Sequence, residues 1–289
     1  MDTSKNSTFY GNAKLGRLND ALLFVQKHFR LFVVLGSFLL SFLFVMVKGE
    51  LLSTVNINLT SHLGQIQKEG TYEGLLYYGD YTLQTNNLIR NRSFVDEGKV
   101  LNRYTPVYPL LLYGAYRVTE WFGLEVRTGI LLLTALLTAL SALLICEIAF
   151  LLYRNRLLAL LAGFVFASQP YILQGLTKTM SVTPFMTFFY LGILLFFGVL
   201  LKRDKNPFLP LLLVGIVLGV ATLTRPIGLF LPFVFAFLFL VLYRGGALLQ
   251  RGLYAAAILA GALLAISPWQ AFNYAHGQKI LLSSDKVHS

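Results

Sequence analysis

Hydrophobic and polar positions alternate in long blocks along this chain. Seven apolar blocks, each bounded by polar or proline-containing breaks, cover residues 31–47, 128–152, 157–173, 182–201, 208–223, 227–242 and 252–266. A helix needs about 20 mainly apolar residues to cross the hydrocarbon layer of a bilayer, with a lower limit of about 17. The pattern therefore predicts an all-α polytopic membrane protein with about seven transmembrane helices and a single module over residues 31–289.

Residues 1–30 precede the first apolar block and are polar and basic. Leu15, Leu18, Leu22 and Val25 recur at helical spacing and make one apolar stripe. This pattern fits a short helix on the inner membrane surface, and a simple cytoplasmic leader fits it equally well. No early apolar stretch of the kind found in a cleavable signal peptide is present before residue 31.

A long polar segment, residues 48–127, separates the first two blocks and forms the predicted outer loop. Within it, residues 107–122 are apolar but are interrupted by Pro109, Arg117 and Glu120. If this run does not cross the membrane, the basic clusters between later blocks fall in short cytoplasmic loops; these are Arg154, Arg156, Lys202, Arg203, Lys205, Arg244 and Arg251. Because cytoplasmic loops are enriched in Lys and Arg, we expect 107–122 to be a juxtamembrane helix in the outer interface. The N-terminus is then cytoplasmic and the C-terminus outside.

Composition supports the membrane assignment and limits the partners. Hydrophobic residues make up 56% and charged residues 13% of the 289 residues, with a mean hydropathy of +0.66, whereas soluble domains carry about 25% charged residues. The net charge of +11 is divided among small clusters, which favours anionic membrane lipid over nucleic acid. Cys146 is the single cysteine, so no intrachain disulfide can form.

The first candidate motif is RYTPVYP at residues 103–109, at the end of the outer loop. A proline disfavours helical geometry in the residue before it, so Pro106 and Pro109 predict an extended or turn segment that fixes Arg103 and Tyr104. The Arg103 guanidinium is suited to bidentate phosphate binding. Tyr and Arg also anchor proteins at the lipid head groups, and this second interpretation stays open.

Two further motifs follow later blocks and fall on the same predicted side. LTRP, residues 223–226, places Arg225 directly before a helix-breaking proline, and SPWQAFNY occupies residues 267–274. Irregular polar backbone at membrane depth is tolerated mainly where it lines a cavity, so a lipid phosphate is one expected partner of Arg225. Snorkelling of this side chain to ordinary head groups is the other.

Carboxylates and metal ligands are scarce. A general base that activates an acceptor hydroxyl would come from the acids of the outer loop, among them Glu69 and Glu73, although solvated loop charges need no such role. The four histidines have no metal-ligand spacing, and the glycine-rich nucleotide-binding motifs are absent. The sequence therefore indicates neither a divalent metal nor a nucleotide cofactor.

The order of these features resembles that in the GT-C membrane glycosyltransferases, in particular the branch with aminoarabinose transferases and protein mannosyltransferase-like enzymes. The shared features are a short first span, a long outer loop ending in RYTPVYP, a Ser-x-x-Pro helix entry at 181–184, LTRP and SPWQAFNY. The resemblance implies transfer of a sugar from a polyprenyl phosphate to a hydroxyl outside the plasma (inner) membrane. It also implies that Arg103, Tyr104 and Tyr108 shape the donor site, that Arg225 faces the lipid phosphate, and that a loop acid is the base.

The chain departs from that family pattern at three places. Lys68 and Gln65 stand where the early loop usually carries an aspartate, so Glu69 and Glu73 are the nearest acids. Val182 and Thr183 replace an acid at the Ser-x-x-Pro entry, and Phe272 replaces the arginine of the last motif. The alternative hypothesis is therefore a non-catalytic structural subunit that retains the fold and packs against a partner membrane protein.

Overall fold

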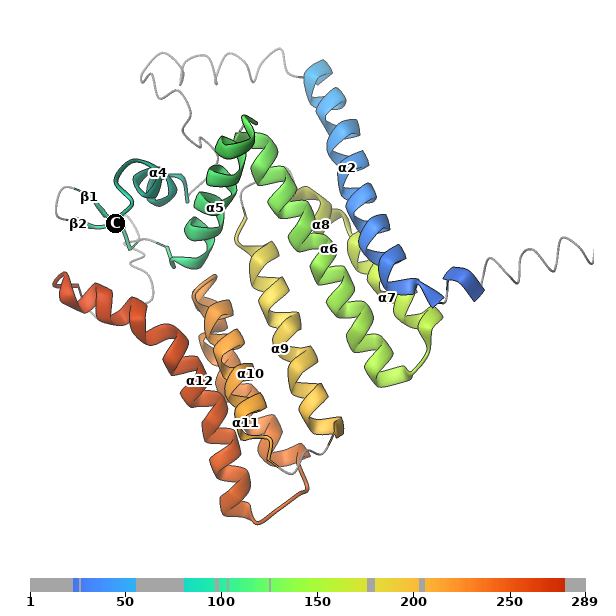
Figure 1. The fold of residues 1–289 in the computed structure, drawn as a ribbon, viewed down its shortest axis with the longest axis vertical. Coiled ribbons are helices and arrows are strands. Elements are labelled where there is room, and N and C mark those ends of the chain that lie inside the picture. Colours follow the sequence, from blue (N-terminus) through green and yellow to red (C-terminus); the bar gives the residue numbers. More distant parts are fainter. Residues whose placement is uncertain are drawn as a thin grey trace, which may run out of the picture.

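The computed structural model describes residues 23–25, 27–55, 81–96, 99–102, 104–124, 126–175, 180–202 and 206–278. Within these ranges the chain is almost entirely helical (Figure 1). The elements are α2 (Phe29–Val55), α4 (Thr82–Asn91), β1 (Val95–Asp96), β2 (Lys99–Val100), α5 (Val107–Phe122), α6 (Val126–Tyr153), α7 (Arg156–Ala167), α8 (Pro170–Gly175), α9 (Val182–Lys202), α10 (Phe208–Thr222), the 3₁₀ helix η1 (Pro226–Phe230), α11 (Leu231–Leu242) and α12 (Leu248–Ala275). The all-α prediction is confirmed apart from the short β1–β2 hairpin.

Three of the described helices are long and apolar enough to cross a bilayer. They are Thr128–Tyr153 within α6, Val182–Lys202 (α9) and Leu248–Ala275 (α12). Shorter apolar helical stretches occur at Phe29–Phe44, Arg156–Ala167, Phe208–Thr222 and Pro226–Leu242. The protein is an integral membrane protein, and the full set of seven spans stays a prediction.

Prolines explain where the expected helices and the observed ones differ. The helix expected over 157–173 is interrupted: α7 ends at Ala167 and α8 begins at Pro170, because a proline disfavours helical geometry in the residue before it. In α12, Pro268 does not end the helix, which continues to Ala275. Pro268 has no amide hydrogen for the Leu264 carbonyl, and the Ser267 hydroxyl donates to that oxygen instead, at 3.3 Å.

Two further helix boundaries differ from the predicted ones, at the end of the first apolar block and at the start of residues 107–122. Helix α2 continues past the predicted end of the first span at residue 47 to Val55. The start of the outer loop at Lys48 stays a prediction. Residues 107–122 form α5 as expected, but the extended geometry predicted up to Pro109 is wrong. Pro109 lies in the first turn of α5, where a helix has no intrahelical acceptor for the backbone N–H that proline lacks.

The helices pack in two groups that share α9 (Figure 1). One core joins α2, α6 and α7, and the other joins α9, α10, α11 and α12. Glycines bring α10 and α12 together: a Cβ on Gly215 would lie 2.0 Å from the Ile258 carbonyl oxygen, and one on Gly261 would lie 2.1 Å from that of Leu212. Such close backbone approach at small residues is typical of helix packing in membranes.

Polar contacts join the helices of the first group. The Ser141 hydroxyl of α6 and the Thr187 hydroxyl of α9 are 2.8 Å apart and buried. Near the C-terminal end of α6, Arg30 of α2 binds both carboxylate oxygens of Glu147 through Nε and Nη2. This acid, which lies within an apolar block, thus has an arginine partner at this end of the bundle.

Candidate functional site

The end of the outer loop is held in place by side chains of α4. Gln84 is buried and its Nε2 donates to the carbonyls of Leu101 and Tyr104, the latter at 2.9 Å. Asn87, one turn later on the same face, donates from Nδ2 to the Ser93 carbonyl at 2.8 Å and to that of Val95 at 2.9 Å. Backbone that has no regular ladder thereby has its carbonyls satisfied, which fixes the path of the chain into α5.

Three tyrosines then pack around the start of α5. The ring centroid of Tyr81 lies 4.4 Å from that of Tyr104 and 4.8 Å from that of Tyr108. The Tyr81 hydroxyl is 2.7 Å from the Ser181 hydroxyl, so the outer loop meets the Ser-x-x-Pro entry of α9. Tyr108 is only 2% exposed, and burial, with a smaller contribution from Tyr81, raises its pKa well above the usual value. Tyr108 therefore supports the cluster as a neutral side chain behind Tyr81.

The corner between α10 and η1 lies against the same segment. The Val107 amide donates to the Leu223 carbonyl at 3.1 Å. The chain then turns sharply, since a Cβ on Gly228 would lie 2.9 Å from the Thr222 Cα, and the Gly228 amide donates to the Arg225 carbonyl at 2.9 Å. RYTPVYP and LTRP, more than a hundred residues apart in sequence, are thus neighbours in space.

Arg225 occupies the exposed side of this corner. Its backbone is extended, with φ −145° and ψ 127°. Thr222 and Thr224, which precede it, are buried and donate their hydroxyls to the carbonyls of Leu218 and Val220, each at 2.9 Å. The Arg225 side chain is half-buried and makes no hydrogen bond or ion pair within the described ranges. A guanidinium so placed can bind an incoming anion without first breaking an internal pair.

The C-terminal part of α12 closes the corner with aromatic rings. Trp269 stacks on Phe272 with ring centroids 5.5 Å apart. Phe94 packs edge-to-face against Trp269, with ring centroids 5.2 Å apart. These rings pack with Leu223 and Val107 in one apolar cluster. Phe272, which stands where the resemblance implied an arginine, is a neutral ring within this cluster, so this position supplies packing and no positive charge.

The structure therefore gathers part of the predicted site. Tyr104, Tyr108 and Arg225 lie around the joined RYTPVYP and LTRP motifs, and we call this region the motif corner. Arg103, Glu69 and Glu73 lie outside the described residues. In the described ranges, Glu147 and Glu120 form ion pairs with Arg30 and Arg117, and no three His, Cys, Asp or Glu side chains come together. That no metal is needed stays a prediction.

Tyr81, Gln84 and Asn87 are the residues that sequence reasoning missed. They fall at i, i+3 and i+6 in a short polar stretch, and this spacing puts them on one face of a helix. The spacing could therefore have predicted a polar face on this helix. It could not have predicted which residues of the loop and of α9 that face contacts. Ser181 had been noted only as part of a helix entry.

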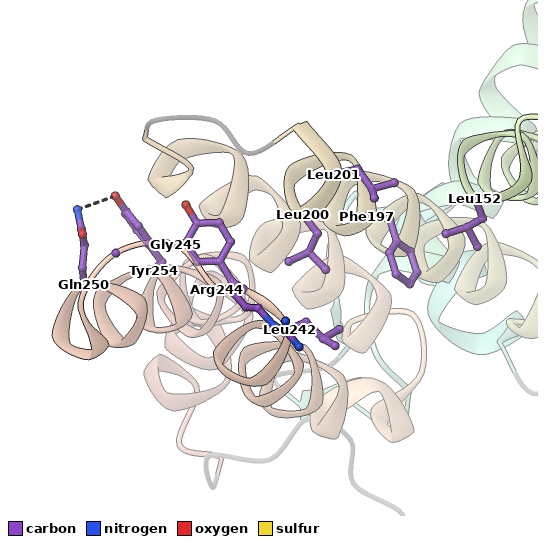
Figure 2. A pocket seen from close by; sticks show the side chains of 11 residues that line it. Leu152, Phe197, Leu200, Leu201, Leu242, Arg244, Gly245, Gln250 and Tyr254 are labelled. Atoms are coloured by element: carbon purple, nitrogen blue, oxygen red, sulfur yellow. Dashed lines mark hydrogen bonds between the residues drawn. The ribbon is translucent and has the colours of Figure 1, made fainter.

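A cavity of about 670 Å³ lies away from this corner, between the C-terminal ends of α6, α9 and α11 and the N-terminal part of α12 (Figure 2). None of its lining residues belongs to the predicted site. The chemistry suggested by the motifs and this cavity at the other end of the bundle are therefore separate features.

These features define an integral membrane protein with a polar, aromatic corner at one end of a helical bundle. A family model described as dolichyl-phosphate-mannose-protein mannosyltransferase matches residues 105–272. The match covers more than half of the chain, which belongs to this family of membrane glycosyltransferases. It includes the segment from Thr105 through LTRP to Phe272, and leaves out Arg103, Glu69 and Glu73. No curated protein and no solved structure matches the chain.

Proposed function

We propose that this protein binds a polyprenyl-phosphate-linked sugar at the motif corner and transfers the sugar to an acceptor hydroxyl at the outer face of the plasma (inner) membrane. The observation that carries the proposal is the contact between Val107 and Leu223. It brings the RYTPVYP segment beside Arg225, whose guanidinium has no counter-ion in the described part of the chain. The family's own name refers to a lipid-phosphate sugar donor.

Arg225 would act on the leaving group. In the transfer, the bond between the anomeric carbon and the phosphate oxygen breaks, its electron pair stays on that oxygen, and the phosphate gains one negative charge. A fixed guanidinium stabilises charge that develops in the transition state more than charge already present, and this difference is what accelerates a reaction. Arg103, from the adjoining segment, would be the second cation.

The acceptor side requires a base. As the acceptor oxygen bonds to the anomeric carbon, its proton would pass to a carboxylate, and Glu69 or Glu73 would fill this role. Val182 and Thr183, at the helix entry where the resemblance implies an acid, are neutral residues at the start of α9, and Thr183 is buried. This leaves the loop acids as the source of the base. Tyr104 would border the donor, with Tyr108 supporting it from behind through Tyr81.

The test measures lipid binding and sugar transfer separately. Full-length protein in nanodiscs would be titrated with undecaprenyl phosphate and dolichyl phosphate, and Arg225→Gln would be compared with Arg244→Gln, which removes a guanidinium at the opposite end. We expect Arg225→Gln to weaken binding about tenfold or more, the loss expected for a hydrogen bond to a charged group, with Arg244→Gln unchanged. Equal binding by both variants and the parent would refute the proposed site.

A second measurement concerns catalysis itself. Cells that lack this protein would be complemented with the parent, Glu69→Gln, Glu73→Gln or the double variant, and lipid-linked and acceptor-linked glycans would be quantified. Loss of product with unchanged lipid binding supports the base assignment. Lipid binding without any product, even in the parent, would assign the chain a non-catalytic role.

A further inference from the structure

We propose that the cavity at the other end of the bundle is a binding site for an anionic phospholipid, independent of the sugar donor. The cavity has a volume of about 670 Å³, within the range of pockets that hold small ligands. Its lining comes from α6, α9, α11, the α11–α12 loop and α12. It is therefore a feature of the tertiary fold rather than of one surface loop.

The lining has an apolar side and a polar side (Figure 2). Leu152, Phe197 and Leu201 form part of the apolar side, and Leu152 and Leu201 are 46% and 50% exposed. The polar side includes Arg244, Gln250 and Tyr254, and Gln250 Nε2 donates to the Tyr254 hydroxyl at 3.3 Å. A phospholipid has the same division, with its acyl chain suited to the leucines and its phosphate to the guanidinium.

Arg251 fixes the backbone of the loop between α11 and α12, and the Arg244 side chain remains free to bind a ligand. Arg251 directs Nε to the carbonyls of Gly245 and Gly246 at 3.2 and 3.3 Å, and Nη2 to that of Arg244 at 3.2 Å. Gly246 has φ +71°, a left-handed conformation that favours glycine. Arg251 thus donates its hydrogen bonds to the loop backbone. The Arg244 guanidinium, in contrast, has neither a hydrogen bond nor an ion pair in the described ranges.

Charge complementarity selects an anionic occupant. Arg154, Arg156 and Lys202 lie at the same end of the bundle, in or next to helix ends that border the cavity. Glu147, the carboxylate described near this end, is already bound to Arg30. Basic residues near a membrane surface attract anionic lipids, and a cation with no protein counter-ion at an apolar groove fits a lipid phosphate better than a zwitterionic head group.

The experiment compares two lipids that share acyl chains and differ in head-group charge. Detergent-purified full-length protein would be mixed with phosphatidylglycerol or phosphatidylcholine, and bound lipid would be counted by native mass spectrometry. We expect retention of phosphatidylglycerol over phosphatidylcholine, reduced about tenfold in Arg244→Gln because a charge-assisted hydrogen bond is lost. Arg117→Gln, an exposed arginine on α5 that pairs with Glu120, is the matched control and should retain the parent's selectivity.

Several outcomes would overturn the proposal. These are equal retention of the two lipids by the parent, equal selectivity of Arg244→Gln and Arg117→Gln, or full displacement of the lipid by inorganic phosphate, which would indicate a free-anion site. If Arg244→Gln does not fold, Leu201→Trp fills the apolar side while leaving the guanidinium in place. That variant should lose phosphatidylglycerol as well, and unchanged retention by it would refute the lipid site. Because no sugar donor is used, failure here leaves the proposed transferase function untouched.

Discussion

Arg225 and Arg244 each follow the end of a hydrophobic helix, α10 and α11 respectively, and both guanidinium groups are without a partner within the described ranges. Their surroundings differ. Arg225 is half-buried beside segments that come from distant parts of the chain, whereas Arg244 is exposed on a short loop that Arg251 fixes from one turn away. A charge in a partly buried, preorganised setting interacts more strongly than one in water. Under the two proposals, the Arg225 end carries the reaction chemistry and the Arg244 end binds an anionic lipid.

The largest effect should appear when sugar transfer and phosphatidylglycerol retention are both measured for variants of the two arginines. Arg225→Gln should reduce sugar transfer by about 100- to 1,000-fold, the usual cost of removing one donor to developing charge, and leave phosphatidylglycerol retention intact. Arg244→Gln should do the reverse, with transfer changed less than threefold, on the order of 0.6 kcal/mol. Initial rates and native mass spectra on the same preparations measure both. If both variants lose transfer equally, the two ends do not have separate roles.

The next effect tests the helix contact that joins the ends. Gly261→Ala should lower stability by about 1–3 kcal/mol, because the new methyl group would overlap the Leu212 carbonyl oxygen and force α10 and α12 apart. The apparent melting temperature in detergent measures the loss. Gly198→Ala on α9 is the control, since a Cβ there has nothing within 4 Å. A stable Gly261→Ala would mean that the α10–α12 packing is looser than described.

A smaller effect should be confined to the motif corner. Tyr81→Phe and Ser181→Ala each remove one side of a hydrogen bond between hydroxyls 2.7 Å apart, and we expect each to cost about 0.5–1.5 kcal/mol. The double variant should cost little more than either single one. Donor binding should weaken while phosphatidylglycerol retention stays the same. Strict additivity of the two single costs would show that this contact does not join the loop to α9.

The smallest effect concerns an arginine that has a protein partner. The Arg30 and Glu147 side chains are 60% and 21% exposed, and exposed ion pairs contribute less than about 1 kcal/mol. A double-mutant cycle with Arg30→Gln and Glu147→Gln should give a coupling energy in that range. A much larger value would indicate that the bilayer shields the pair from water, and the same shielding would then strengthen the anion affinity expected at Arg244.

Helices could be predicted more easily than their ends. The blocks at 128–152, 182–201 and 208–223 correspond closely to α6, α9 and α10, because long apolar runs have few alternatives to a helix in lipid. The ends depended on local bonds. Ser267 satisfies a carbonyl that Pro268 leaves free, so α12 continues past a residue that usually stops a helix.

The motif corner could be predicted only in outline. Charge placement put RYTPVYP, LTRP and SPWQAFNY at the same end of the bundle, and the contacts of Val107 with Leu223 and of Phe94 with Trp269 agree with this. The role of α4 was missed, because most of the carbonyls that Gln84 and Asn87 bind, those of Ser93, Leu101 and Tyr104, lie on irregular backbone. Tyr108 is buried against Tyr81, and its expected place beside the donor stays a prediction.

The sequence by itself determined that the protein lies in a membrane, where its helices run, and which residues carry charge, since these depend on transfer from water to lipid, residue by residue. The tertiary structure decided which faces meet. In a helix such as α10 the lipid-facing and the buried sides are both apolar. The hydrophobic pattern therefore does not predict which helices pack against it. The glycine contacts of α10 with α12, the tyrosine cluster and the cavity beside Arg244 arise only when separate helices come together.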